Sequence, residues 1–214
     1  GHFQLIRYYD DRSTYNIIMA PPKTQQRQAM IWAASKLFRR RGYSGTGLRE
    51  ILAASGAARG SLYHHFPGGK EEIGVASVTA AGGLVTETLA ELARQTESPA
   101  DFLRHYADLL IRWLEGSKFQ DGCPITLMLL EMTPRSAPIS FAGHAVLTHW
   151  RTVMADMLAQ HGWPPEQTAS TVTALIAGLE GALMLARVEC NAKPVRDTVQ
   201  ALCWMLDGGL PSKC

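Results

Sequence analysis

Apolar residues recur along this chain with the period of an α-helix, and the alternation typical of a β-strand hardly appears. The first clear segment has apolar residues at i, i+3, i+4, i+7 and i+8, namely Met30, Ala33, Ala34, Leu37 and Phe38. This spacing builds one apolar face of a helix, and Gly42 is placed to end it.

Two shorter helices are expected next. The second has an apolar face that begins at Leu48, and it ends at Gly56. The third covers about residues 57–66 and faces Leu62 and Phe66 inward, after which a Pro-Gly-Gly sequence breaks the chain. Two short helices joined by a tight turn, braced by a first helix, form the helix-turn-helix pattern.

The remainder of the chain predicts a longer helical body. Periodic segments and their caps place helices at about residues 70–96, 98–116, 125–132, 140–161, 167–190 and 194–206. Residues 1–20 do not fit this pattern, and we treat them as an N-terminal extension in which Gly1-His2 is typical of an expression tag.

Composition narrows the class of protein. The chain has 214 residues, of which 46% are hydrophobic, enough for one large domain or for a small module joined to a larger one. Its four cysteines are scattered without a CxxC pair, so neither a zinc site nor a disulfide framework is indicated. No apolar run approaches the ~20 residues of a transmembrane helix, and the first residues are not typical of a signal peptide. We therefore expect a cytoplasmic protein with no metal, no cofactor and no membrane partner.

Charge is distributed unevenly. Residues 21–75 carry nine Lys or Arg and three Glu, a net charge of +6, whereas the whole chain has a net charge of +2. A compact basic segment on a mildly acidic body is typical of a surface that binds a polyanion. A solvated basic helix end at residues 39–41 accounts for the same charges equally well.

The outer face of the third helix carries the candidate chemistry. With Leu62 and Phe66 in the core, the residues that project from the opposite face are Arg59, Gly60, Tyr63 and His64. A helix set into the major groove of DNA uses such groups for base edges and phosphates together.

Each side chain has an expected role. Arg59 is the first candidate for a base contact, because a guanidinium bonds guanine in a fork. Tyr63 and Lys70 are expected to hold phosphates. Three further donors are expected near the DNA backbone: Thr46, Arg49 and Ser61.

The same residues also have ordinary structural explanations. Tyr63 and His64 are typical of half-buried surface positions, and Lys70 is typical of a solvated helix start. Arg59 is placed where an ion pair with Glu50 would also account for it. The spacing of the whole set, rather than any single residue, favours DNA binding.

The sequence of residues 42–72, GYSGTGLREILAASGAARGSLYHHFPGGKEE, resembles the DNA-binding domain of the TetR family of bacterial transcriptional regulators. Its most recognisable part is LYHHF at residues 62–66, followed by Lys70. The form SGAARGSLYHHFPGGKEE looks most like the LmrA/YxaF branch of that family. GCPI at residues 122–125 and LEGA at residues 179–182 look like body helices of the same branch.

This resemblance implies an all-α, TetR-like fold with two domains. Residues 21–69 are expected to form an N-terminal three-helix helix-turn-helix DNA-binding domain, and residues 70–214 a C-terminal helical domain for ligand binding and dimerisation. The resemblance also implies a homodimeric repressor on double-stranded operator DNA. A small hydrophobic ligand, aromatic or amphipathic, is expected to release it.

Two sets of body residues are candidates for these roles. In TetR-like proteins the last two long helices pair between subunits, which implies a dimer interface that includes Ala174, Gly178, Gly181, Ala182, Val199 and Leu202. Packing within one chain is the alternative. Large adaptable side chains suit a ligand pocket: Phe102, Tyr106, Trp113, Met128, Trp150, Met154 and Met184. Glu131 and Glu180 are expected among its polar points, although such stripes also form ordinary core.

Two other functions fit the same sequence. A DNA-binding regulator without a small-molecule effector, governed by a protein partner or by its own abundance, uses the same helix-turn-helix residues. An enzyme is the remaining alternative, and the chain has no GxSxG, HExxH, P-loop or GxGxxG motif to support one.

Overall fold

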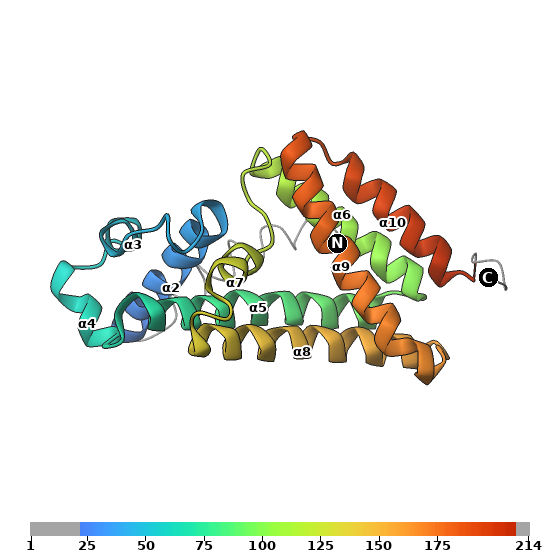
Figure 1. Ribbon diagram of the computed structural model, residues 1–214, viewed down its shortest axis with the longest axis horizontal. Helices are drawn as coiled ribbons and strands as arrows, with labels where there is room; N and C mark the ends of the chain where they lie inside the picture. Colours follow the sequence, from blue (N-terminus) through green and yellow to red (C-terminus); the bar gives the residue numbers. More distant parts are fainter. Residues whose placement is uncertain (1–21, 209–214) are drawn as a thin grey trace. The chain divides into compact units, whose positions relative to one another are not determined.

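The computed structural model describes residues 22–208, and across this range the chain folds into helices joined by turns and loops (Figure 1). Their bounds are α2 (Pro22–Arg41), α3 (Leu48–Ser55), the 3₁₀ helix η1 (Arg59–Ser61), α4 (Leu62–His65), α5 (Gly69–Gln95), α6 (Pro99–Gly116), α7 (Thr126–Met132), α8 (Ala137–Gln160), α9 (Pro165–Glu189) and α10 (Lys193–Leu206). The predicted all-α fold is confirmed. The extension predicted for residues 1–20 lies outside the described residues.

The third predicted helix takes a different form. Instead of one helix over residues 57–66, the chain makes the 3₁₀ turn η1 and then the single α-helical turn α4. Ala58, which precedes η1, is extended (ψ 142°) and has no side chain that can cap, while the Ser61 hydroxyl donates to its carbonyl at 2.7 Å. Phe66 leaves helical geometry (φ −140°, ψ 77°) because the following Pro67 disfavours it. A missing cap at one end and a proline at the other therefore shorten this helix.

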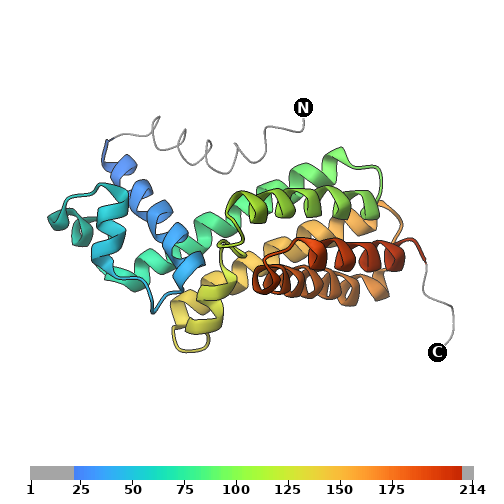
Figure 2. The same cartoon turned by 90° about the horizontal axis from the view of Figure 1, so that it is seen from above.

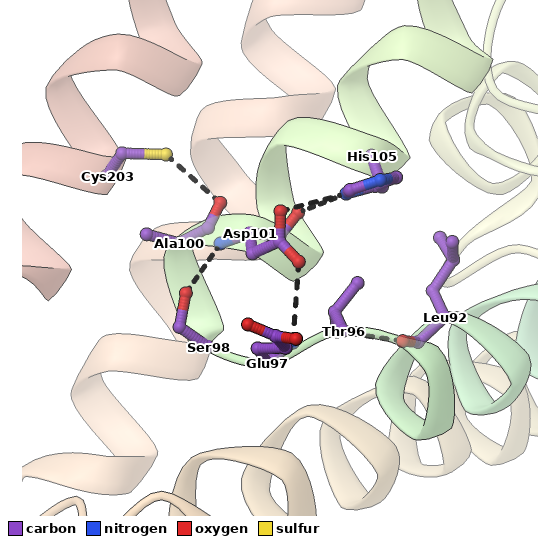
Figure 3. A network of polar contacts seen from close by, with 8 residues as sticks. All are labelled: Leu92, Thr96, Glu97, Ser98, Ala100, Asp101, His105 and Cys203. Carbon is purple, nitrogen blue, oxygen red and sulfur yellow. Dashed lines mark hydrogen bonds and ion pairs between the residues drawn. The ribbon is translucent and has the colours of Figure 1, made fainter.

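The ends of α2 and α6 show how the sequence limits the helices. Gly42, with φ 75°, ends α2, and its N–H donates to a carbonyl of the last turn at 2.8 Å. α6 begins after Ser98, whose Oγ accepts the Asp101 N–H at 3.0 Å. Figure 3 shows this N-terminus, where the Asp101 carboxylate also lies 3.1 Å from Nδ1 of His105.

The helices cluster into two compact units. The first contains residues 22–84 and 123–147, and the second contains residues 85–122 and 148–208. This division differs from the predicted boundary between residues 69 and 70. The reason is that α7 groups with the first helices, while α5 and α8 each contribute to both units.

In the first unit, α2 packs against α3 and α7. Its core includes fully buried side chains of Met30, Phe38, Ile51, Leu62, Phe66 and Ile73. α5 and α8 run in the same direction there, because Gly74 lies against Ile139 and Gly82 lies against Val146. A β-carbon at Gly82 would lie 2.3 Å from Cγ1 of Val146, so this close approach requires glycine.

In the second unit, α10 packs against both α6 and α9. α9 and α10 lie side by side in both views (Figure 1, Figure 2). Gly178 permits this contact, since a β-carbon there would lie 3.1 Å from Cδ1 of Leu202. The buried Cys203 lies with its Sγ 3.5 Å from the Ala100 carbonyl oxygen, which joins α10 to the start of α6 (Figure 3).

Two helices, α5 and α9, are long and apolar enough to cross a membrane by length and composition alone, although we expected no such segment. The apolar stretch of α5 is 56% buried within the molecule, and that of α9 is 39% buried. A core helix of a soluble protein passes the same test, so this finding is weak support for a membrane role. The lower burial of α9 reflects an apolar face that is described below.

Candidate nucleic-acid interface

One carboxylate fixes the start of α3. Glu50 accepts the Gly47 N–H through Oε2 at 2.8 Å, and its Oε1 lies 2.6 Å from Nη1 of Arg41. The hydrogen bond from Gly47, and then the charge of Arg41, hold the pKa of Glu50 below its ordinary value. Because Gly47 has no side-chain oxygen, Glu50 supplies half of a capping box.

Residues 59–65, which form η1 and α4, are here called the recognition segment. Leu62 is buried, so the opposite side of this segment carries exposed Tyr63 and His64, and Tyr63 is 64% exposed. Gly60 is exposed as well, with open space where a side chain would begin. A phenol and an imidazole beside uncovered backbone form a surface that a DNA groove can approach.

Lys70 lies in the first turn of α5 and is half-buried. Its Nζ lies 4.2 Å from the centroid of the Tyr43 ring, a cation–π contact, and Tyr43 in turn stacks on Phe38 with ring centroids 5.4 Å apart. Burial lowers the pKa of Lys70, while the charges of Glu131 and Glu50 act in the opposite direction. The ammonium group is therefore held in a defined place beside the recognition segment.

The structure corrects two of the predicted DNA contacts. Thr46 is 1% exposed, and its Oγ1 donates to a backbone carbonyl of the α2–α3 turn at 2.9 Å, so the prediction that it contacts DNA is wrong. The Ser61 hydroxyl donates its one proton to the Ala58 carbonyl, so it has none for a phosphate in this conformation. Arg49 is exposed on α3. The side chain of Arg59 lies outside the described part of the chain, and its base contact stays a prediction.

Sequence reasoning missed the place of Glu131. It is predicted beside a ligand pocket, but the structure places it on α7 against the turn between α2 and α3. Its Oε2 accepts the Ser44 N–H at 2.7 Å, and its Oε1 lies where a β-carbon of Gly42 would come within 1.6 Å. Glu131 and Ser44 are 87 residues apart, so no local pattern links them. The packing of α7 on α2 brings them together.

α9 carries an apolar face that no other part of residues 22–208 covers. Its exposed members follow helical spacing: Ala174, Ala177, Met184, Leu185 and Val188. Val188 is 77% exposed, and Trp204 on α10 is also exposed. An apolar face of this kind on a folded protein is typical of a contact with another molecule.

The predicted interface residues lie only partly on this face. Ala174 is exposed, and Gly181 has open space around its β-carbon position. Gly178 and Leu202 contact each other within the chain. Ala182 and Val199 are 1% and 5% exposed, so for these two the prediction is wrong, because their side chains pack inside the second unit.

The predicted pocket residues do not form one group. Met184 is 57% exposed on the apolar face of α9, unlike the buried and half-buried members of the set, and its place in a pocket stays a prediction. Met128 belongs to the first unit, where its sulfur lies near Gly74. The other six are buried or half-buried in the second unit: Phe102, Tyr106, Trp113, Trp150, Met154 and Glu180. That they surround a ligand stays a prediction. Within residues 22–208, no three His, Cys, Asp or Glu side chains gather in a group that could hold a metal ion.

Two parts of the chain match families of known proteins. Residues 31–76 match the family described as bacterial regulatory proteins, tetR family. Residues 99–201 match the family described as transcriptional regulator LmrA/YxaF-like, C-terminal domain. The first range contains α3, the recognition segment and Lys70, which are the elements of the candidate interface.

Relatives cover most of the chain. The HTH-type transcriptional regulator LmrA of Bacillus subtilis is 30% identical over 169 residues, which cover 79% of this chain and 90% of the relative. The HTH-type transcriptional repressor DhaR of a Mycobacterium species is 27% identical over 186 residues, which cover 81% of this chain and 88% of the relative. The crystal structure of regulatory protein TetR from Rhodobacter sphaeroides shares the fold, with a TM-score of 0.75 at 24% identity over 82% of this chain and 96% of that one. The chain belongs to the TetR family of bacterial transcriptional regulators, with an LmrA/YxaF-like C-terminal domain, and is a DNA-binding regulator and not an enzyme.

Proposed function

We propose that the chain is a homodimeric repressor that occupies a two-fold symmetric operator and is released from it by a small aromatic or amphipathic ligand. The observation that carries the dimer is the uncovered apolar face of α9, with Met184, Leu185 and Val188, together with exposed Trp204 on α10. A helix-turn-helix protein ordinarily engages two half-sites. A second copy of the chain that packs on this face supplies the second helix-turn-helix.

In the proposed complex, the recognition segment enters the major groove. Arg59 bonds a base edge, while Tyr63 and Lys70 hold phosphates. The exposure of Tyr63 and the net charge of +6 over residues 21–75 support these roles. Lys70 is already partly desolvated and held on the Tyr43 ring, so it loses less freedom on binding a phosphate than a fully mobile lysine does.

The repressor and ligand roles have separate support. The relative DhaR is named a repressor, which favours repression here. Buried Phe102, Trp150 and Met154 in the second unit are side chains that suit a flat apolar molecule. A regulator of this kind acts where bacterial DNA lies, so we place it in the cytoplasm, with no cofactor and no membrane partner.

Sedimentation velocity at micromolar concentration tests the dimer. The unmutated protein should sediment at twice the chain mass of 23.4 kDa. Val188→Glu, which puts a charge on the apolar face of α9, should shift it toward the monomer without unfolding it. Thr79→Glu, at an exposed position of α5 in the first unit, is the matched control and should leave the dimer intact. A monomer in the unmutated protein overturns the proposal.

Calorimetry with and without saturating operator DNA tests the ligand role. The operator is first selected from random duplexes with the purified protein, and binders are found by screening flat aromatic and amphipathic compounds. A releasing ligand must bind the operator complex more weakly, by a factor of about 5–150 for ordinary coupling. If every compound binds the free protein and the operator complex with equal affinity, none of them is a releasing ligand. The alternative function would then hold: a DNA-binding regulator without a small-molecule effector, governed by a protein partner or by its own abundance.

A further inference from the structure

We infer that Glu131 is a positioning residue for DNA binding, because its carboxylate fixes the turn whose aromatic ring carries Lys70. The inference rests on the proposed phosphate contact of Lys70. The contacts that support it all lie within the first unit and run from α7 through the turn at residues 42–44 to the start of α5.

The first link joins Glu131 to the turn. The Ser44 N–H donates to Oε2 at 2.7 Å, and a hydrogen bond from a backbone amide to a carboxylate is stronger than one to a neutral acceptor. Oε1 occupies the space beside Gly42, where a β-carbon would lie 1.6 Å away. Gly42 also has φ 75°, so two independent constraints require glycine where the carboxylate sits.

The second link joins the turn to Lys70. Tyr43 lies between the two residues that Glu131 contacts, and its ring stacks on Phe38 of α2. The same ring lies 3.3 Å from the β-carbon position of Gly74 on α5, and it carries the Lys70 ammonium at 4.2 Å. A shift of the turn therefore moves the surface on which the ammonium rests.

The position of the carboxylate is unfavourable in one respect. It lies beyond the C-terminal end of α2, where the partial charge of the helix dipole is negative and repels an anion. The Ser44 N–H and the charge of Lys70 offset this, and the charge of Glu131 in turn raises the pKa of Lys70 against the effect of burial. A contact that the local dipole opposes, and that a specific backbone donor holds, points to a positioning role rather than to generic packing.

The test measures binding of the full chain to a labelled random-sequence duplex by fluorescence anisotropy over a range of salt concentrations. Glu131→Ala should weaken binding by about three- to tenfold, as expected for the loss of one such hydrogen bond. It should also reduce the salt dependence by about one phosphate contact, as Lys70→Ala does. Glu131→Gln keeps the acceptor for the Ser44 N–H and should restore both quantities to within about twofold of the unmutated protein.

Two further variants separate positioning from other effects. Glu91→Ala removes the same charge in the second unit, where Glu91 contacts Arg94 and Gln95, and should change nothing. Lys70→Ala with Glu131→Ala should show the salt dependence of Lys70→Ala alone. A smaller folded fraction lowers the apparent affinity at every salt concentration alike, so loss of structure does not imitate this result.

Three results overturn the inference while Lys70 keeps its role. These are unmutated behaviour of Glu131→Ala, failure of Glu131→Gln to restore binding, and additive losses in the double variant. If Lys70→Ala itself leaves the salt dependence unchanged, the phosphate role of Lys70 fails, and the inference about Glu131 falls with it.

Discussion

At the scale of single residues, polar groups near the recognition segment divide into those that the protein satisfies and those that it leaves exposed. Thr46 and Ser61 donate to backbone carbonyls, and Glu50 is shared between a backbone amide and Arg41. Tyr63 is left exposed, and Lys70 is held but still half-exposed. Groups of the first kind stabilise the turns around the recognition segment, and groups of the second kind are those that we propose to contact DNA.

Arg59→Ala and Lys70→Ala should therefore fail in different ways. If Arg59 bonds a base, its loss costs about 1–3 kcal/mol and relaxes the preference at one operator position per half-site. If Lys70 holds a phosphate, its loss weakens all sequences alike and lowers the salt slope by about one. Binding of both variants to selected and to scrambled duplexes distinguishes these effects. Equal losses on both duplexes for Arg59→Ala would remove base reading from Arg59.

The lowered pKa of Lys70 predicts a dependence on alkaline pH. Burial disfavours the charged ammonium, so Lys70 loses its proton at a lower pH than a fully solvated lysine. A phosphate contact that needs the proton is complete below that pKa and is lost as pH rises through it. Lys70→Arg keeps its charge at alkaline pH, so its affinity should stay level where that of the unmutated protein falls. Parallel pH profiles of the two proteins would contradict this.

Part of the candidate site was predictable from the sequence. The exposure of Tyr63 and His64 follows from the burial of Leu62 one helical face away. The role of Glu131 was not predictable, because its partner Ser44 is 87 residues away and tertiary packing brings the two together. The role of Thr46 was missed although its partner is local, the carbonyl of Gly42 four residues earlier. The sequence alone does not distinguish a hydroxyl that faces DNA from one that donates to a carbonyl of its own turn.

At the scale of elements, α9 and α10 show two kinds of small-residue position. Gly178 faces α10, where a β-carbon would meet Leu202 at 3.1 Å, whereas Gly181 meets nothing within the described chain. Both glycines belong to one stripe in the sequence, yet one serves packing within the chain and the other lies on the uncovered apolar face. Periodicity places residues on a helix, but it does not say which neighbour each side of the helix meets.

Gly178→Leu and Gly181→Leu should separate these two contacts. Gly178→Leu overpacks α9 against α10 and should lower the free energy of unfolding by about 1–3 kcal/mol. Gly181→Leu should leave the fold of the single chain intact, since the position is open, and should instead disturb the proposed dimer. Urea unfolding and sedimentation of both variants check this. Equal destabilisation of the single chain by both would contradict the assignment of the two faces.

Most elements were predictable because their apolar spacing and caps are local. Ser98 before Pro99 marks the start of α6, and Gly42 marks the end of α2. The recognition segment was predicted as one longer helix, because the spacing of Leu62 and Phe66 outweighed two local signals that shorten it, the missing cap at Ala58 and the proline at Pro67.

At the scale of the whole molecule, the compact units do not follow the order of the sequence. A break at the Pro-Gly-Gly before Lys70 suggests a domain boundary, but residues 123–147 belong to the first unit. Helices α5 and α8 contribute to both units, so the chain connects DNA-binding and body regions through them. Complementary faces decide which helices pack together, and the apolar period of a single helix does not reveal its partner.

The proposed function requires this chain to recognise a particular DNA sequence through its helix-turn-helix. The most direct measurement is the ratio of its affinities for a duplex selected from random sequences and for a scrambled duplex of the same length, at physiological salt. We expect a two-fold symmetric selected site that is bound at least about 10³-fold more tightly than the scrambled one. Equal affinity for the two duplexes would contradict it.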